Sequence, residues 1–233
     1  MRITFISDTH TKHNEITKDL PGGDLIIHAG DLMNSGKDAS DIAEFAYWFN
    51  SLDNYEHKVF IAGNHDRMFE EYPDLAMDLL TAYGPDLVYL QDKSHYLDYS
   101  HKNINDTEVQ LYGTPWQPTF YDWAFNLPRN GEDLREKFSM IPPTVDILIC
   151  HTMPFGHCDN VQQNRVGCEV LREYTDLIQP KIFVGGHIHS GAGYKFDGHT
   201  HFFNASVLNN SYKYTNKPMT IDWNPITNEI EFI

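Results

Sequence analysis

The sequence has few cysteines and no long hydrophobic run. Its three cysteines are Cys150, Cys158 and Cys168. An odd number without close pairing is typical of reduced thiols, because secreted domains usually carry even, paired sets. No apolar stretch reaches the ~18 residues of a transmembrane helix, and the first residues enter a strand without a signal peptide's apolar region. We therefore expect a cytoplasmic protein that does not cross a membrane.

Basic residues are also scarce. The 233 residues include 17 Lys and Arg against 33 Asp and Glu, which gives a formal net charge of −16. Such a protein repels long polyanions, so DNA or RNA is not expected as the main substrate. A small anion remains compatible, because bound divalent cations dominate the local field and distant charges are screened within ~8 Å at physiological salt.

Repeats, low-complexity tracts and Gly/Ser linkers are absent, which predicts one domain over residues 1–233. Short runs rich in β-branched residues predict strands at 3–6, 25–28, 58–62, 87–90, 109–113, 147–150, 182–184, 201–204, 219–222 and 229–233. Helical periodicity predicts helices over 42–52, 75–83 and 166–178. Strands separated by helices favour two layers of sheet with helices outside.

Five polar fragments directly follow predicted strands. They are Asp8-Thr9-His10, Gly30-Asp31, Gly63-Asn64-His65-Asp66, His151 and Gly186-His187-Ile188-His189. In sheets of this kind, functional sites gather beyond the carboxyl ends of the strands. Asp, His and Asn are ligands for divalent metals, and seven of them are enough for a two-metal hydrolytic site.

The simplest division of the seven gives each of two metals its own ligands and one shared carboxylate. Asp31 is the expected bridge, since it has an oxygen for each ion. The first ion would take Asp8, His10 and His189, and the second would take Asn64, His151 and His187. Two such ions can clamp a phosphate and lower the pKa of a shared water toward ~7. The expected reaction is attack of the resulting hydroxide on phosphorus, in line with the leaving oxygen.

Four residues outside this set have expected roles in catalysis or substrate binding. His65 is not needed as a ligand, so it can protonate the leaving alkoxide or stabilise charge on the phosphoryl oxygens. Asp66 is expected to orient it. Arg67 either reaches the phosphate or is a surface arginine, and Trp116 either stacks on a nucleobase or packs within its loop.

Four more histidines are not assigned to the site. His28 lies on a predicted strand and is expected to be a buried, hydrogen-bonded core residue. His13, His157 and His201 are close in sequence to the site segments, but we expect them in solvated loops.

The five fragments, in this order over residues 5–190, look like those of the calcineurin-like metallophosphoesterase superfamily. Within it the chain most resembles the metallophosphoesterase-domain (MPPED) type. The supporting segments are His28-Ala29-Gly30-Asp31, Ile61-Ala62-Gly63-Asn64-His65-Asp66, Gly113-Thr114-Pro115-Trp116-Gln117-Pro118, Arg165-Val166-Gly167-Cys168 and Asn204-Ala205-Ser206. The resemblance implies a four-layered α/β/β/α sandwich of two mixed sheets, with Mn, Fe, Zn or Ni at the site. It also implies phosphodiesterase activity on small nucleotides, including cyclic ones.

His187 is informative within this resemblance, because some members of the family have glycine there and lose a ligand to the second metal. This chain is therefore expected to hold two metals. A phosphomonoesterase or a nuclease with the same site is an alternative, and a non-catalytic scaffold is another. The scaffold is disfavoured because every expected ligand position is filled. The sequence carries no signal for oligomeric state.

Overall fold

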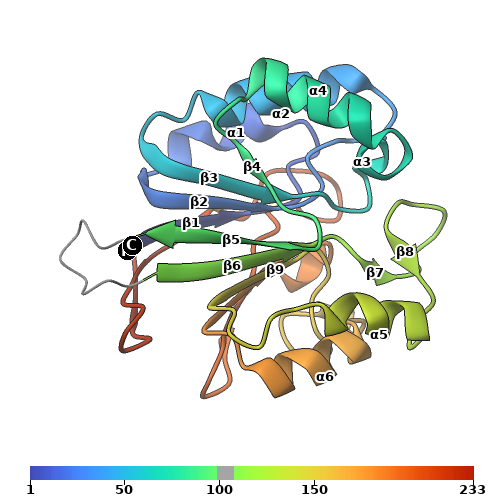
Figure 1. Ribbon diagram of the computed structural model, residues 1–233, viewed down its shortest axis with the longest axis vertical. Helices are drawn as coiled ribbons and strands as arrows, with labels where there is room; N and C mark the ends of the chain where they lie inside the picture. The colour runs from blue at the N-terminus through green and yellow to red at the C-terminus, as the bar shows by residue number, and fades with distance from the viewer. Residues whose placement is uncertain (99–107) are drawn as a thin grey trace.

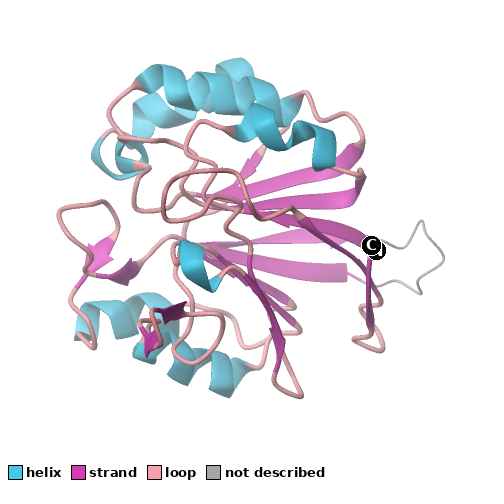
Figure 2. Ribbon diagram, turned by 180° about the vertical axis from the view of Figure 1, so that it is seen from behind, coloured by secondary structure: helices cyan, strands magenta, loops and turns pink. Residues whose placement is uncertain are grey.

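Two six-stranded β-sheets lie face to face in the computed structural model, which describes residues 1–98 and 108–233. Helices α1 to α4 cover the outer face of one sheet, and helices α5 and α6 cover the outer face of the other (Figure 1). The view from behind shows the same succession of helix, sheet, sheet and helix (Figure 2). The predicted four-layered α/β/β/α sandwich is confirmed.

The first sheet has the strand order β16-β15-β1-β2-β3-β4. Strands β1 to β4 are parallel, and β15 and β16 extend the sheet in antiparallel fashion. The strands are β1 (Arg2–Ile6), β2 (Gly23–Ala29), β3 (Tyr55–Ile61), β4 (Val88–Tyr89), β15 (Met219–Trp223) and β16 (Ile230–Phe232).

The second sheet has the order β13-β14-β12-β9-β6-β5. Its four central strands are parallel and its two edge strands antiparallel. The strands are β5 (Lys93–Asp98), β6 (Glu108–Thr114), β9 (Ile147–Cys150), β12 (Ile182–Gly185), β13 (Gly193–Phe196) and β14 (His201–Asn204). Two small two-stranded sheets join β7 (Gln117–Pro118) to β8 (Asn126–Leu127) and β10 (Asn160–Val161) to β11 (Asn164–Arg165).

The helices are short. They are α1 (His13–Ile16), α2 (Ala39–Asn50), α3 (Arg67–Glu71), α4 (Pro73–Tyr83), α5 (Glu132–Ser139) and α6 (Glu169–Ile178), with 3₁₀ turns η1 (Thr17–Asp19) and η3 (His189–Gly191). Within residues 1–98 and 108–233, no helix combines the length and apolarity needed to cross a membrane.

The core follows the two-residue period of the strands. On β2, Leu25 and Ile27 face the second sheet, whereas Ile26 between them packs under the helices of the first layer. On β9, Ile147 and Ile149 likewise lie between the sheets, and Leu148 packs toward α5 and α6. Strands that are buried on both faces read as continuous apolar runs, which is why the sequence revealed them.

The largest differences from the sequence prediction lie at edges and helix ends. The edge strands β5 and β13 were not predicted, because half-exposed strands lack a continuous apolar run. The third predicted helix begins at Glu169 rather than Val166, because Cys168 is its N-cap and its Sγ accepts from Leu171 N at 3.3 Å. The three cysteines are free thiols, as expected.

Candidate metal centre

The structure brings all seven predicted ligands to one place, between the two sheets at the carboxyl ends of their parallel strands. Segments that follow β1, β2 and β3 supply Asp8, His10, Asp31 and Asn64. Segments that follow β9 and β12 in the second sheet supply the other three, which are His151, His187 and His189. Five of the seven are buried, and His187 and His189 are partly exposed on the open side.

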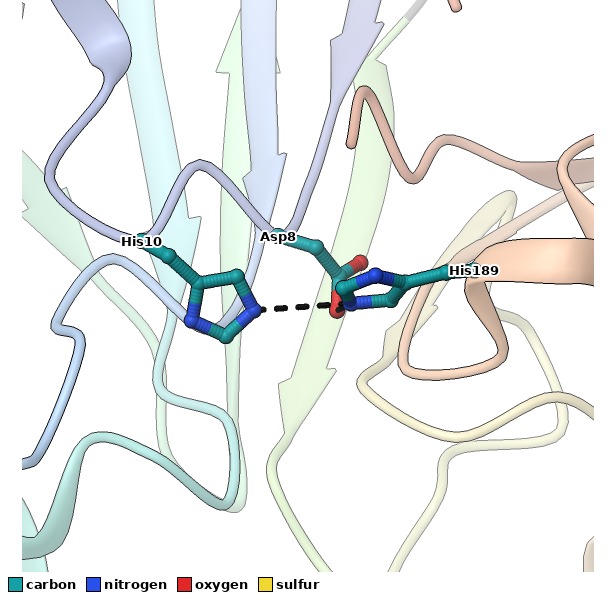
Figure 3. Close-up of side chains that lie close together, drawn as sticks. All are labelled: Asp8, His10 and His189. Atoms are coloured by element: carbon teal, nitrogen blue, oxygen red, sulfur yellow. Dashed lines mark hydrogen bonds and ion pairs between the residues drawn. The ribbon is translucent and has the colours of Figure 1, made fainter. Parts of the chain in front are cut away.

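Asp8, His10 and His189 form the first cluster (Figure 3). The Nε2 atom of His189 lies 3.2 Å from Asp8 Oδ1 and 3.4 Å from His10 Nε2. The cluster joins segments 179 residues apart in the chain. Only the packing of the two sheets brings them together.

Asp31, His151 and His187 form the second cluster, with ligand atoms within 4.8 Å of one another. Asn64 belongs to the same group, since its Oδ1 is 3.1 Å from His151 Nε2. Asp31 lies between the clusters: its Oδ1 is 3.4 Å from His151 Nε2, and its Oδ2 is 3.7 Å from His10 Nε2. The carboxylate thus presents one oxygen to each cluster, and its role as a bridge stays a prediction.

Backbone carbonyls fix the direction of three imidazoles. The Nδ1 atoms of His10, His151 and His189 lie 3.0, 2.8 and 3.1 Å from the carbonyl oxygens of Met33, Ala29 and Asn209. A carbonyl only accepts, so each Nδ1 carries a proton, and in the neutral ring Nε2 turns a lone pair toward the clusters.

Where a ring nitrogen faces an oxygen acceptor, a proton or a metal ion between the two atoms removes the repulsion of their lone pairs. Donor atoms about 2.1 Å from one ion lie roughly 3.0 to 3.5 Å apart. The Nε2 atom of His151 lies 3.1 Å from Asn64 Oδ1, and that of His189 lies 3.2 Å from Asp8 Oδ1. The donor set therefore fits divalent metal ions.

The pKa values of the four histidines depend on the balance between burial and the nearby carboxylates. Burial opposes protonation of His151, but the Asp31 carboxylate raises its pKa to about 9. Burial likewise opposes protonation of His189, and its hydrogen bond to Asp8 raises the pKa to about 9. Burial lowers the pKa of His10 to about 4 and that of His187 to about 3, so both rings stay neutral at pH 7 and their lone pairs are available to a metal.

Four of the seven predicted ligands have a strained backbone conformation. Asp8, His10, Asp31 and His187 have φ angles of +54°, +40°, +59° and +63°, in the left-handed region that non-glycine residues rarely adopt. Such residues cost roughly 1–3 kcal/mol each and cluster at functional sites. A Cβ at Gly186 would lie 2.2 Å from Asp8 Oδ2, so the turn before His187 requires glycine.

His65 lies beside the first cluster. Its ring is 4.5 Å from that of His10 and stacks on Trp123 at 3.9 Å with an interplanar angle of 24°. Its Nδ1 lies 2.5 Å from the carbonyl oxygen of Asn34, which fixes a proton on Nδ1 and aims Nε2 toward the site.

The expectation that Asp66 orients His65 is wrong. Its carboxylate accepts from the backbone N–H groups of Asp31, Met33 and Gly63 at 2.9, 2.8 and 2.7 Å, and more weakly from Leu32. Asp66 therefore shapes the loop that carries Asp31. The carbonyl of Asn34, rather than Asp66, orients the His65 ring. Asp66 and His65 are neighbours in the sequence, which suggested that they form a pair, but the hydrogen bonds of the Asp66 carboxylate are with backbone N–H groups.

Asp66→Asn is expected to lower the free energy of unfolding by about 1.5–3 kcal/mol, because an amide N–H₂ would face backbone donors in place of a charged acceptor. Urea denaturation of the metal-free protein would measure it, with the exposed Asp86→Asn as the matched control. A variant with unchanged stability but impaired turnover would instead restore the original role of Asp66.

The two predicted substrate contacts have other partners. The guanidinium of Arg67 pairs with Glu71 at 2.8 Å and donates to the carbonyl of Asp122 at 2.6 Å. Trp116 donates from Nε1 to Asp92 at 2.8 Å, and Lys137 lies 4.4 Å from the centre of its ring. Trp116 is thus held by residues outside its own loop and packs against the core, so neither predicted role describes its contacts in full. Arg67 is held by the protein, in line with its alternative as a surface arginine.

Aromatic residues other than Trp116 lie beside the site. Trp123 stacks on His65, Phe120 lies edge-on to His187 with ring centroids 5.1 Å apart, and Tyr212 contacts His10. The run Phe120-Tyr121-Asp122-Trp123 is the signal that sequence reasoning missed, since aromatics in a polar loop are unusual.

The remaining histidines divide differently from the prediction. His28 is buried, bonded through Nε2 to Thr9 Oγ1 and through Nδ1 to Gly30 N, as expected. The expectation of solvated loop positions for His13, His157 and His201 is wrong, because all three are buried against aromatic rings.

Known proteins are similar to this chain in sequence. A model of the calcineurin-like phosphoesterase family matches residues 1–191. The chain is 40% identical to human metallophosphoesterase domain-containing protein 1 over 239 residues, covering 95% of this chain and 70% of that one. It is 35% identical to UPF0046 protein T07D4.2 of Caenorhabditis elegans, covering 95% and 60%.

Solved structures share the fold at low identity. TT1561 of Thermus thermophilus matches with a TM-score of 0.61 at 15% identity, covering 99% of this chain and 97% of that one. GAP50, the anchor in the inner membrane complex of Plasmodium, matches with a TM-score of 0.52 at 11% identity, covering 95% and 80%. The sequence matches show that this chain belongs to the calcineurin-like phosphoesterase family of metal-dependent phosphoesterases, and the candidate ligand clusters agree with this.

Proposed function

We propose that this protein is a phosphodiesterase that binds two divalent metal ions and hydrolyses small phosphate esters, including cyclic nucleotides. The single observation that carries the proposal is the position of Asp31, whose two carboxylate oxygens face two separate groups of imidazoles. Manganese, iron, zinc and nickel all suit a mixture of His, Asp and Asn donors.

In this proposal Asp8, His10 and His189 hold one ion, and Asn64, His151 and His187 hold the other. Asp31 contributes to both. When bound, the ions supply positive charge that clamps the phosphate and lowers the pKa of a water that serves as nucleophile.

The chain itself supplies orientation and a proton. The carbonyl of Asn34 and the ring of Trp123 fix the His65 imidazole, so its Nε2 has one direction available. A protonated Nε2 can donate to the leaving oxygen or to a phosphoryl oxygen as charge develops there.

The size of the site and the net charge of the whole chain support small substrates. A hollow of about 160 Å³ lies over the ligands, bordered by Asp31, Asn64, His65 and Tyr212. The net charge of −16 disfavours the approach of a polynucleotide. Both features favour a small ester over DNA or RNA.

Metal dependence is the direct test. Protein purified from Mn²⁺-supplemented medium is expected to contain two metal ions per chain and to hydrolyse bis-p-nitrophenyl phosphate. Chelation with EDTA should abolish turnover and lower the melting temperature, because the ions bind only the folded chain. Rates on p-nitrophenyl phosphate and single-stranded DNA, measured alongside, test the monoesterase and nuclease alternatives. Metal content near zero without turnover would contradict the proposal and favour a scaffold.

A further inference from the structure

A second cavity opens beside the candidate metal centre. Its volume is about 390 Å³, and Phe120, His187, His189 and Asn210 line both it and the smaller hollow over the ligands. A group esterified to a phosphate at the metals therefore has space to extend into this cavity. Ligand sites of small molecules have volumes of roughly 300–1,000 Å³.

The walls of the cavity are largely apolar. Pro118 and Phe120 come from the loop around β7, Val161 and Val166 from the β10–β11 hairpin, and Ile188 from the turn after β12. Threonine, serine and asparagine supply the remaining uncharged groups. Apart from the site histidines, Arg129 is the charged residue among those that line it.

The guanidinium of Arg129 already has partners within the chain. One terminal nitrogen donates to Glu169 at 2.5 Å and to the carbonyl of Gly167 at 3.0 Å, and the other donates to the carbonyl of Val166 at 2.9 Å. The carboxylate of Glu169 balances the guanidinium. A second phosphate or a carboxylate in this cavity would meet no free cation among the described residues that line it, in a protein that is already strongly acidic.

Aromatic surface is exposed at the mouth of the cavity. Phe120 is 45% and Tyr121 77% exposed, with ring centroids 4.6 Å apart. Both lie in the β7–β8 loop, which extends beyond the strand ends of the two sheets (Figure 1). Contiguous exposed apolar surface is a feature of ligand-binding grooves and interaction sites.

Asn126 braces this aromatic loop. Its Nδ2 donates to the carbonyls of Tyr121 and Trp123 at 2.9 and 3.0 Å, and its Oδ1 accepts from Phe120 N at 3.2 Å. A loop held by one side chain in this way is ordered before a ligand arrives, which reduces the entropy lost on binding.

We propose that this cavity binds the organic group of the phosphate ester and selects a neutral, planar aromatic group over an anionic one. The proposal rests on the function proposed above, because the metals hold the phosphate. It assigns substrate choice to Phe120 and the valines of the β10–β11 hairpin, and it predicts esters with a single phosphate.

Binding of non-hydrolysable phosphonates tests this without turnover. Calorimetry on the Mn²⁺-loaded protein would compare 2-naphthylmethylphosphonate, butylphosphonate and 4-phosphonobutyrate, which share the metal-binding group and differ in the group that enters the cavity. We expect the aryl compound to bind about 10-fold or more tighter than the butyl compound, a stacking contribution. The carboxylate should bind more weakly than both.

Phe120→Ala should lower the affinity for the aryl compound more than the affinity for butylphosphonate and so remove most of the preference, because only the aryl group stacks on the Phe120 ring. Phe196→Ala is the matched control, because Phe196 is 47% exposed on β13 and does not line the cavity. Equal affinity for aryl and butyl compounds, tighter binding of the carboxylate, or an unchanged preference in Phe120→Ala would overturn the proposal. Failure of the proposed function is seen separately, as absent metal or absent hydrolysis of bis-p-nitrophenyl phosphate.

Discussion

Asp31→Asn is expected to lower kcat/KM for bis-p-nitrophenyl phosphate by at least about 10³-fold, because metal charge supplies several kcal/mol of transition-state stabilisation. The amide keeps the shape of the carboxylate but offers one neutral oxygen where the proposal requires two anionic ones. Bound metal should also fall below two per chain. Steady-state kinetics and elemental analysis of the same preparation measure both effects.

Asp222→Asn is the matched control for this variant. Asp222 pairs with Arg2 at the partly exposed start of β1, far along the strand from the site, so its loss should leave turnover and metal content unchanged. Melting temperatures of the metal-free variants separate unfolding from loss of metal. Full turnover with two metals in Asp31→Asn would rule out the bridging role.

His65→Ala is expected to lower kcat by about 10²–10⁴-fold, the usual contribution of a general acid. Metal content should stay at two per chain, since His65 is assigned to neither ion. The size of the loss reports what the imidazole does. A proton donor to the leaving oxygen matters most for alkoxides, so the loss should be larger for an alkyl ester than for a nitrophenyl ester. Stabilisation of phosphoryl charge predicts equal losses.

His199→Ala serves as the comparison, because His199 is exposed in the turn between β13 and β14. Undiminished turnover of His65→Ala on both kinds of ester would remove His65 from the reaction. A parallel loss of metal would make it a ligand instead, in keeping with its position close to His10 and Asp31.

Much of the fold could be predicted because its central strands are buried on both faces. Runs such as Leu25–His28 and Ile147–Cys150 have no alternation, and they correspond to the parallel strands β2 and β9. The edge strands β5 and β13 of the second sheet were not predicted in this way. In β5 and β13, exposed positions interrupt the apolar pattern, and their strand state depends on pairing with a neighbour. Val166 fits the helical spacing of apolar residues, which predicts it as part of the third helix. The helix begins only at Glu169, because Cys168 is its N-cap.

The sequence by itself determined the chemical identity of the candidate site. Asp, His and Asn that directly follow apolar strands are expected at the carboxyl ends of parallel strands, so their types and order were sufficient to predict seven candidate ligands and the family. The tertiary structure decided how these residues act together. One oxygen of Asp31 faces each cluster. The carboxylate of Asp66 accepts hydrogen bonds from backbone donors, and the carbonyl of Asn34 orients His65.

Trp116 and Phe120 show why the contacts within the site could not be predicted from the sequence. Both are aromatic residues in one Pro-containing segment, and local sequence ranks neither above the other. Asp92 and Lys137, distant in sequence, hold Trp116 in the protein, whereas the bonds of Asn126 leave Phe120 exposed beside the cavity. Residue type sets which contacts are possible, but contacts between distant segments depend on how two sheets pack, and that packing is a property of the whole chain.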